Sequence, residues 1–137
     1  MNMEYSLAIG LEKLCMPLLV AKVNDAALTF IIDTGATHNT VASFVYEQLS
    51  GGFTLSDKEN KVMGIEGNYH STPVVEAVLY LDDTPVRTEF SVVDMNDAVM
   101  QIQNEVGLQI HGFLGIPFLV ENKCVLDFEK KTIVINK

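Results

Sequence analysis

The sequence predicts an all-β protein that forms a single domain over residues 1–137, and three observations support this. Turn-forming residues recur at short intervals, which favours many strands over a few long helices. The apolar runs between the turns are rich in residues that strands prefer, and they are not organised as repeats. Apolar residues make up 48% of the 137 residues, which is enough to build one core. We expect no more than one or two short helices.

The first predicted element is a β-hairpin. Leu14–Val23 and Ala27–Ile32 are apolar runs rich in Val, Ile and Leu, and Asn24-Asp25 between them suits a tight turn. After a loop, Thr40–Ala42 is a short strand. Ser43 is placed to cap a short helix that ends at Leu49, just before two glycines.

The middle of the chain predicts a second hairpin. Its strands are Lys58–Met63 and Tyr69–Leu81, and Pro73 interrupts the second of them. Gly64-Ile65-Glu66-Gly67 forms the glycine-bearing tip between the two strands. A pair of aspartates then turns the chain into a strand over Val86–Val93.

The last third of the chain returns to short elements. Asn96–Leu108 is polar with poor periodicity, so it predicts a surface loop with one helical turn. Phe113-Leu114 is a short buried strand, and Pro117–Val120 is a helical turn. The chain then forms two strands, Cys124–Phe128 and Thr132–Ile135, joined by a charged turn.

Charge argues against a nucleic-acid partner. Acidic residues outnumber basic residues by 18 to 9, and the net charge of −9 repels a phosphate backbone. Met1–Tyr5 lacks the basic start and long apolar stretch of a signal peptide, and no apolar run reaches the ~20 residues of a membrane span. We therefore expect a soluble, cytoplasmic protein without a membrane partner. A chain whose signal segment had been removed would show the same sequence.

Cysteine and histidine residues are too scattered to predict a metal site. Cys15 and Cys124 lack CxxC spacing, and two buried thiols are favoured over a disulfide. His38, His70 and His111 form neither an HExxH motif nor an i, i+4 pair. We expect no metal and no other cofactor, with His38 a solvated loop residue and His111 a structural one.

The most informative pattern is a carboxylate, Asp33, placed directly after the buried strand and at the start of a glycine-bearing loop. A catalytic carboxylate needs rigid support and a partly dry setting, and the end of a buried strand offers both. An aspartate that only capped a turn would not need the apolar residues before it. Asp-Thr-Gly alone is short enough to arise by chance, so neighbouring motifs must support it.

Three motifs in order resemble the retropepsins, the dimeric aspartic proteases of retroviruses and their cellular and bacterial relatives. Asp33-Thr34-Gly35-Ala36 resembles the catalytic loop. Gly112–Leu119 resembles the apolar-apolar-Gly motif with its following helix, and Lys123–Phe128 resembles the next strand. Gly64-Ile65-Glu66-Gly67 lies where the family has its flap, the hairpin that closes over bound peptide. The resemblance runs from Leu14 to Ile135, and it implies a closed β-barrel with a homodimeric active site.

The resemblance also implies roles for single residues. Asp33 would share a proton with its symmetry mate, Thr34 would bond across the dimer axis, and the Gly35 backbone would let water and substrate approach. Gly115 would pack beneath this loop. The residues implied in substrate binding are Ala36, Thr37, Gly64, Ile65, Glu66, Gly67 and Phe113.

Each motif also has a plainer interpretation. Gly64 and Gly67 alone would suit an ordinary hairpin turn, and Phe113–Gly115 alone would suit a core strand that ends in a turn. The occurrence of all three motifs in family order favours the retropepsin fold over these alternatives.

One departure from the retroviral enzymes concerns substrate recognition. They typically have an acidic residue at the position of Thr37 and an arginine at that of Ile116, and those two groups pair. Replacing both members of an ion pair with uncharged residues can be nearly neutral for stability, whereas losing one would strand a charge. The fold is therefore expected to survive, while substrate specificity should not be carried over from the viral enzymes.

The resemblance implies an aspartic endopeptidase that cleaves peptides or proteins as a homodimer. The chain has one Asp-Thr-Gly and is too short for two lobes, so two copies must supply the site. The interface is expected to use the catalytic loop, the flap tips and the terminal strands, with Thr132–Asn136 as an unpaired edge. The main alternative is a catalytically silent module of the same fold that dimerises or binds peptides. A small-molecule-binding β-barrel is a weaker one, because it would be monomeric and would give the carboxylates no role.

Overall fold

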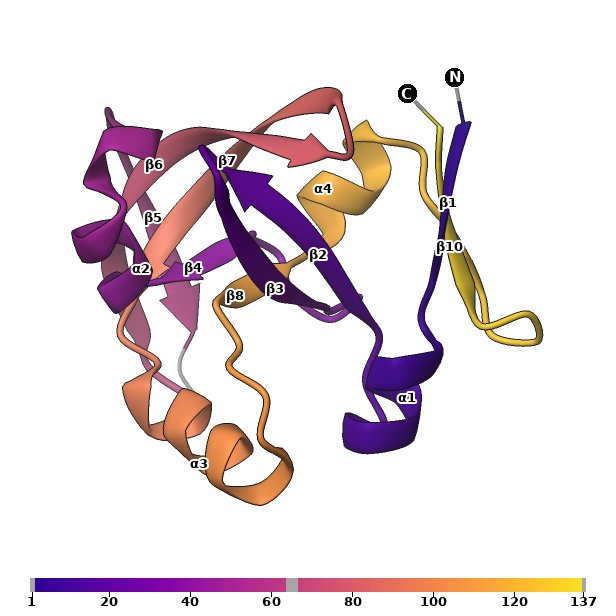
Figure 1. The fold of residues 1–137 in the computed structure, drawn as a ribbon. Helices are drawn as coiled ribbons and strands as arrows, with labels where there is room; N and C mark the ends of the chain where they lie inside the picture. Colours follow the sequence, from indigo (N-terminus) through magenta and orange to yellow (C-terminus); the bar gives the residue numbers. More distant parts are fainter. Residues whose placement is uncertain (1, 64–66, 137) are drawn as a thin grey trace.

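The computed structural model describes residues 2–63 and 67–136, and Figure 1 shows how their elements are arranged. Within these residues the helices number four rather than the predicted one or two: α1 (Ala8–Leu14), α2 (Ser43–Gln48), α3 (Asn96–Val106) and α4 (Ile116–Glu121), with a 3-10 turn at Ser50–Gly52. None of the described helices has the length and apolar character needed to cross a membrane. The strands are β1 (Asn2–Ser6), β2 (Leu18–Val23), β3 (Ala26–Ile32), β4 (Thr40–Ala42), β5 (Phe53–Met63), β6 (Tyr69–Leu81), β7 (Thr84–Val93), β8 (Gly112–Leu114), β9 (Val125–Asp127) and β10 (Thr132–Asn136).

The larger sheet closes on itself through six strands. Its neighbours follow the order β2-β3-β8-β4-β7-β6, and Lys22 of β2 pairs with Tyr80 of β6 to complete the ring. β5 lies outside the ring, paired with β6. In the core, the buried rings of Phe30 and Phe90 stack with their centroids 5.6 Å apart. The predicted all-β class, with barrel-like closure, is confirmed.

The ends of β3 and β8 meet because these strands are parallel neighbours. Ile32, at the end of β3, pairs with Leu114, at the end of β8. Parallel strands end at the same edge of a sheet, so the residues that follow them emerge side by side. Those residues are Asp33 and Gly115, and the N–H of Asp33 donates a hydrogen bond to the C=O of Leu114 at 2.9 Å. The two sequence motifs are thus brought together by the sheet topology.

A second sheet of three strands joins the first and last segments described. Its order is β1-β10-β9, and both pairings are antiparallel (Figure 1). Ile133 and Ile135 of β10 are buried in the same core cluster as Phe118 of α4. The expectation that Thr132–Asn136 is an unpaired edge is wrong, because β10 is central and β1 covers one of its sides.

α3 is longer than its sequence predicts. The polarity of Asn96–Leu108 indicates a loop with one helical turn, whereas the structure has a helix of 11 residues. Val99 is its one buried residue, and Ile102 and Val106 on the same face are partly buried, so a short apolar stripe at helical spacing is present that the expectation of a loop overlooked. Oδ1 of Asp94 accepts a hydrogen bond from the N–H of Asn96 at the start, and Gly107 ends the helix with a φ of 75°.

The other predicted elements are present with shifted boundaries. Leu14 belongs to α1, so β2 begins at Leu18. Ser43 is the first residue of α2 and does not cap it. β5 begins at Phe53, and β6 runs through Pro73 without a break because Pro73 lies where β6 pairs with β5 alone among the described strands.

Both cysteines are free thiols, but only one of them is even partly buried. Cys15 is exposed, contrary to the expectation of two buried thiols. It ends α1 in a left-handed conformation with a φ of 54°, which places it on a surface turn. Cys124 is half-buried, and this burial raises its pKa to about 11.

Candidate active site

Asp33 is held in place by the backbone around it. Its own N–H is bonded to Leu114, and its C=O accepts a hydrogen bond from the N–H of Ala36 at 3.2 Å. The N–H of Gly35 donates to Oδ1 of the Asp33 carboxylate at 2.9 Å, which fixes the direction of the side chain. Asp33 is partly exposed, and its Oδ2 has no hydrogen-bond partner within residues 2–63 and 67–136. One carboxylate oxygen is therefore oriented by the loop and the other is open.

Gly115 lies directly beneath the catalytic loop, as the resemblance implies. A Cβ atom at this position would lie 2.7 Å from the C=O oxygen of Ala36 and 2.7 Å from that of His38. The N–H of Ile116 donates to the same Ala36 oxygen at 2.9 Å. Only a residue without a side chain allows the two segments to approach this closely.

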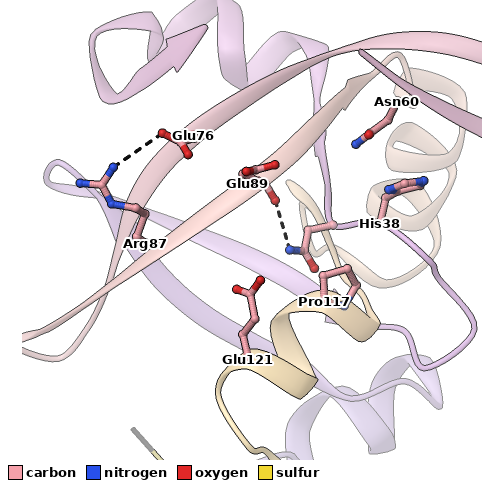
Figure 2. A pocket seen from close by; sticks show the side chains of 8 residues that line it. His38, Asn60, Glu76, Arg87, Glu89, Pro117 and Glu121 are labelled. Atoms are coloured by element: carbon pink, nitrogen blue, oxygen red, sulfur yellow. Dashed lines mark hydrogen bonds and ion pairs between the residues drawn. The ribbon is translucent and has the colours of Figure 1, made fainter. Parts of the chain in front are cut away.

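Asn39 fastens the far end of the loop, although nothing in its sequence spacing marks it. It is 5% exposed. Its Oδ1 accepts hydrogen bonds from the N–H of Gly115 at 2.8 Å and from that of Phe118 at 3.4 Å. Its Nδ2 donates to the C=O of Glu89 on β7 at 3.1 Å, the contact drawn at Glu89 in Figure 2. Asn39 is recognised as a structural residue because it is a buried polar side chain whose oxygen and nitrogen both form hydrogen bonds. That feature is visible only in the folded structure and not in the sequence.

Behind the loop lies a hollow of about 360 Å³, with Asn39 in its wall (Figure 2). His38 faces it from the loop, and Glu121 faces it from α4. The guanidinium of Arg87 lies 3.6 Å from the carboxylate of Glu76 on the neighbouring strand. His38 is half-buried here, rather than the solvated loop residue that the sequence predicts.

Two further hollows open on Asp33 from the other face of the loop. The larger has a volume of about 910 Å³ and extends past Phe113 to the first turn of α3. The smaller has a volume of about 410 Å³ and extends past Thr37 to Tyr69. The two hollows share five lining residues: Asp33, Ala36, Thr40, Val62 and Met63. Together they therefore form one groove that contains Asp33.

The end of the β5–β6 hairpin forms one side of this groove. Val62, Met63 and Tyr69 line it. Among the described residues, Tyr69–Pro73 of β6 pairs with β5 alone, so this part of the hairpin projects beyond the ring as a two-stranded ribbon. At the base of the ribbon, the register shifts between Leu55 and Glu59.

Two polar contacts join the base of the ribbon to β7. The Lys58 ammonium lies 2.9 Å from the Glu89 carboxylate, which raises the pKa of Lys58 through this hydrogen bond and charge pair. Nδ2 of Asn60 donates to Oγ of Ser91 at 2.9 Å. These two contacts hold the ribbon at its base.

The remaining predicted site residues are distributed as follows. Thr34 and Gly35 are exposed, and Gly35 lines the smaller hollow. Phe113 lines the larger one, half-buried. Gly67 is exposed, with a φ of 90° that only glycine adopts easily. The predicted flap residues Gly64, Ile65 and Glu66 lie outside the described residues.

Thr37 and Ile116, the two positions expected to depart from the retroviral pattern, lie on segments that are in contact. Thr37 is exposed and lines the groove, and Ile116 is 40% exposed at the start of α4. The backbone bond from Ile116 to Ala36 brings the two segments together. No charge is stranded, because neither position is ionisable.

His111 is part of the sheet rather than of the groove. Its Nδ1 accepts a hydrogen bond from the N–H of Thr29 at 2.8 Å, and its Nε2 lies 3.1 Å from Oε1 of Gln109. Burial lowers the pKa of His111, in keeping with the acceptor role of the neutral ring. In the part of the chain that the structure describes, no three His, Cys, Asp or Glu side chains are grouped to hold a metal.

Comparison with known proteins agrees with this geometry. The sequence model of one family, described as aspartyl protease, matches residues 19–118, which include β3, the loop of Asp33 and the glycine beneath it. The chain belongs to the aspartyl protease family. No curated protein matches its sequence.

Two solved structures have a similar fold. The first is the EIAV protease complexed with the inhibitor HBY-793, with a TM-score of 0.57 and 17% identity over 82% of this chain and 93% of that one. The second is the retroviral protease-like domain of Ddi1 from Leishmania major, with a TM-score of 0.54 and 11% identity over 86% and 89%. At this identity the likeness concerns the fold, and it confirms the retropepsin-like architecture that the motifs imply.

Proposed function

We propose that this protein is an aspartic endopeptidase whose catalytic pair consists of Asp33 from each of two copies. The observation that carries the proposal is the setting of Asp33: its backbone is fixed between β3 and β8, Gly35 orients one carboxylate oxygen, and the other faces a groove large enough for a peptide. Membership of the aspartyl protease family supports the same chemistry.

The second carboxylate has to come from another chain. The sequence has one Asp-Thr-Gly, and one chain therefore supplies half of a pair. Thr34, next to Asp33, is exposed, and it has no hydrogen-bond partner among the residues that the structure describes. An exposed threonine beside the carboxylate is available to the matching threonine of a second copy, as the retropepsin pattern implies.

The interface proposed here differs from the one that the sequence predicts. β10 is paired on both sides and cannot accept another strand. The catalytic loop remains an interface element, and β1 and β9 are the outer strands of their sheet. An outer strand has free backbone N–H and C=O groups along one side, so a second copy would add to β1 or β9 and not to β10.

The proposed reaction uses the carboxyl pair as both base and acid. Two carboxylates about 3 Å apart cannot both ionise at low cost, so the pair holds one proton. The ionised Asp33 takes a proton from a water molecule held between the two, and that water attacks the carbonyl carbon of the peptide. The protonated Asp33 donates its proton to the carbonyl oxygen. As the tetrahedral intermediate collapses and the C–N bond breaks, the Asp33 that took the proton from water donates it to the leaving amine, and the other Asp33 takes a proton back from a hydroxyl of the diol, so the pair again holds one proton.

The test is digestion of a peptide mixture by the wild type and by Asp33→Asn, from about pH 3 to pH 9, with sedimentation of both proteins at micromolar concentration. We expect wild-type cleavage with a bell-shaped pH profile on the acid side of neutrality, because the pair works only while it holds one proton. Asp33→Asn should sediment as a dimer, without cleavage. Cleavage that persists in Asp33→Asn would exclude the aspartic mechanism. A wild type that dimerises and binds peptides without cleaving them would instead be the catalytically silent module.

A further inference from the structure

The two halves of the groove carry opposite charge. Asp33 stands between them, and beyond it the ionisable residues of the larger hollow are Asp94 and Asp97. The smaller hollow instead contains Lys61 and His38. A peptide that fills the groove therefore meets carboxylates on one side of Asp33 and an ammonium on the other.

The carboxylates of the larger hollow lie where the chain passes from β7 into α3. Asp94 follows β7, and Asp97 lies in the first turn of α3. The Asp94 side chain is oriented by its hydrogen bond from Asn96. Neither carboxylate forms an ion pair with a lysine or arginine within residues 2–63 and 67–136, so both are available to a ligand.

Apolar side chains line the same hollow as Asp33 and these carboxylates. Phe113 comes from β8, Val93 from β7, and Val62 and Met63 from the hairpin, with Met95 beside α3. A long side chain that fills this hollow would contact both the apolar groups and the carboxylates of Asp94 and Asp97. Lysine and arginine have this construction, an aliphatic stem with a cationic end.

We propose that the larger hollow selects a lysine or arginine side chain of the substrate peptide, and that Asp97 is a specificity-determining residue. This inference rests on the proposed function, because it assigns the substrate class of the same groove. The apolar walls take the stem, and the carboxylates at the α3 end pair with the ammonium or guanidinium. A phenylalanine or leucine would fill the apolar part without that pairing.

The experiment compares peptides that differ at one residue near the cleaved bond, which is lysine, norleucine or glutamate. Norleucine keeps the stem of lysine and lacks its charge. For the wild type we expect kcat/KM to be about fivefold higher for lysine than for norleucine, and lower still for glutamate. Asp97→Asn should bring the lysine and norleucine values together, and Asp97→Lys should favour glutamate.

The control separates local pairing from the overall negative charge of the protein. Glu105→Lys makes the same change of charge on the exposed end of the same helix, away from the groove. It should leave the order of the three peptides unchanged. Thermal unfolding of each variant shows whether α3 is intact. A wild type with no preference for lysine, or equal effects of Asp97→Lys and Glu105→Lys, would overturn the proposal.

A measurement of peptide binding separates the test of specificity from the test of catalysis. The same three peptides, labelled with a fluorophore, are titrated with Asp33→Asn and with Asp33→Asn carrying Asp97→Lys, and anisotropy is measured. If the wild type does not cleave, the proposed function fails, while a lysine preference in binding that reverses in the double variant still supports the specificity. If cleavage occurs but neither cleavage nor binding depends on residue 97, the specificity fails and the protease function stands.

Discussion

Replacing Asn39 with leucine should lower the free energy of unfolding by about 2–4 kcal/mol and cut turnover by more than tenfold. Leucine has nearly the same size and no polar atom, so the Gly115 N–H loses its acceptor at 2.8 Å. A buried donor without a partner costs about 1–3 kcal/mol. The bond to the Glu89 C=O adds about 1 kcal/mol, because Glu89 is exposed and water can replace the lost donor. The Phe118 bond is long at 3.4 Å and adds little.

The loss of activity should exceed what the loss of stability explains. A domain stable by about 5–15 kcal/mol stays folded after this change, so turnover measured at 25 °C reports on a folded protein. The loop that holds Asp33 would then have lost its tie to Gly115 and β7, and a displacement of about 1 Å is enough to slow a reaction by up to about a hundredfold.

Asn122→Leu is the matched control. Asn122 is also buried, at 6% exposure, but its Nδ2 makes a single hydrogen bond, to the C=O of Phe118 within α4, at 2.9 Å. Asn122→Leu should lower the free energy of unfolding by about 1 kcal/mol and leave turnover close to that of the wild type. Urea unfolding and peptide hydrolysis of both variants decide the matter. If Asn39→Leu costs no more than Asn122→Leu, or slows turnover no more, the hydrogen bonds of Asn39 do not position the loop.

Two further predictions concern the glycine beneath the loop and a histidine of the sheet. Gly115→Ala should lower the melting temperature and abolish activity, because the new Cβ would lie 2.7 Å from two carbonyl oxygens. The control is Gly51→Ala, whose Cβ would meet nothing within 4 Å and which should leave the melting temperature and the activity unchanged. Equal effects of the two substitutions would contradict the close packing at Gly115. His111 should contribute stability that is fully present above its ordinary pKa of 6.5 and is lost as the pH falls toward its lowered folded pKa, because protonation removes the acceptor for Thr29. Urea unfolding at about pH 7.5 and pH 5 should show a smaller loss for His111→Gln than for the wild type, and an equal loss would refute the assignment.

Local sequence was sufficient for the part of the site built from motifs. Asp33 and Gly115 could be predicted because each follows an apolar strand and each belongs to a short motif with a required glycine. The resemblance implied their contact, and the structure produces it through the parallel pairing of β3 and β8.

The remaining parts depend on contacts that are distant in the sequence. The role of Asn39 depends on its hydrogen bonds to Gly115 and Glu89, which lie 76 and 50 residues away in the sequence. β1 is a strand because it pairs with β10 at the other end of the described chain, a pairing that no local pattern signals. α3 was not expected because most of its residues are polar and exposed, although Val99, Ile102 and Val106 recur at helical spacing and Gly107 was a visible stop signal.

The ribbon at the end of the β5–β6 hairpin has a consequence for the rate at which peptides enter and leave. A two-stranded ribbon without a third strand is only marginally stable in water, so its resting angle is determined at its base. The base combines the register shift between Leu55 and Glu59 with the Lys58–Glu89 ion pair and the Asn60–Ser91 hydrogen bond. Under the proposed function, the stiffness of this joint would govern how often the groove opens, while Asp33, which follows β3, stays held by its loop. The rate of groove opening and the rate of the chemical step can therefore change independently. Salt concentration would act on the rate of opening, because it screens the exposed Lys58–Glu89 ion pair.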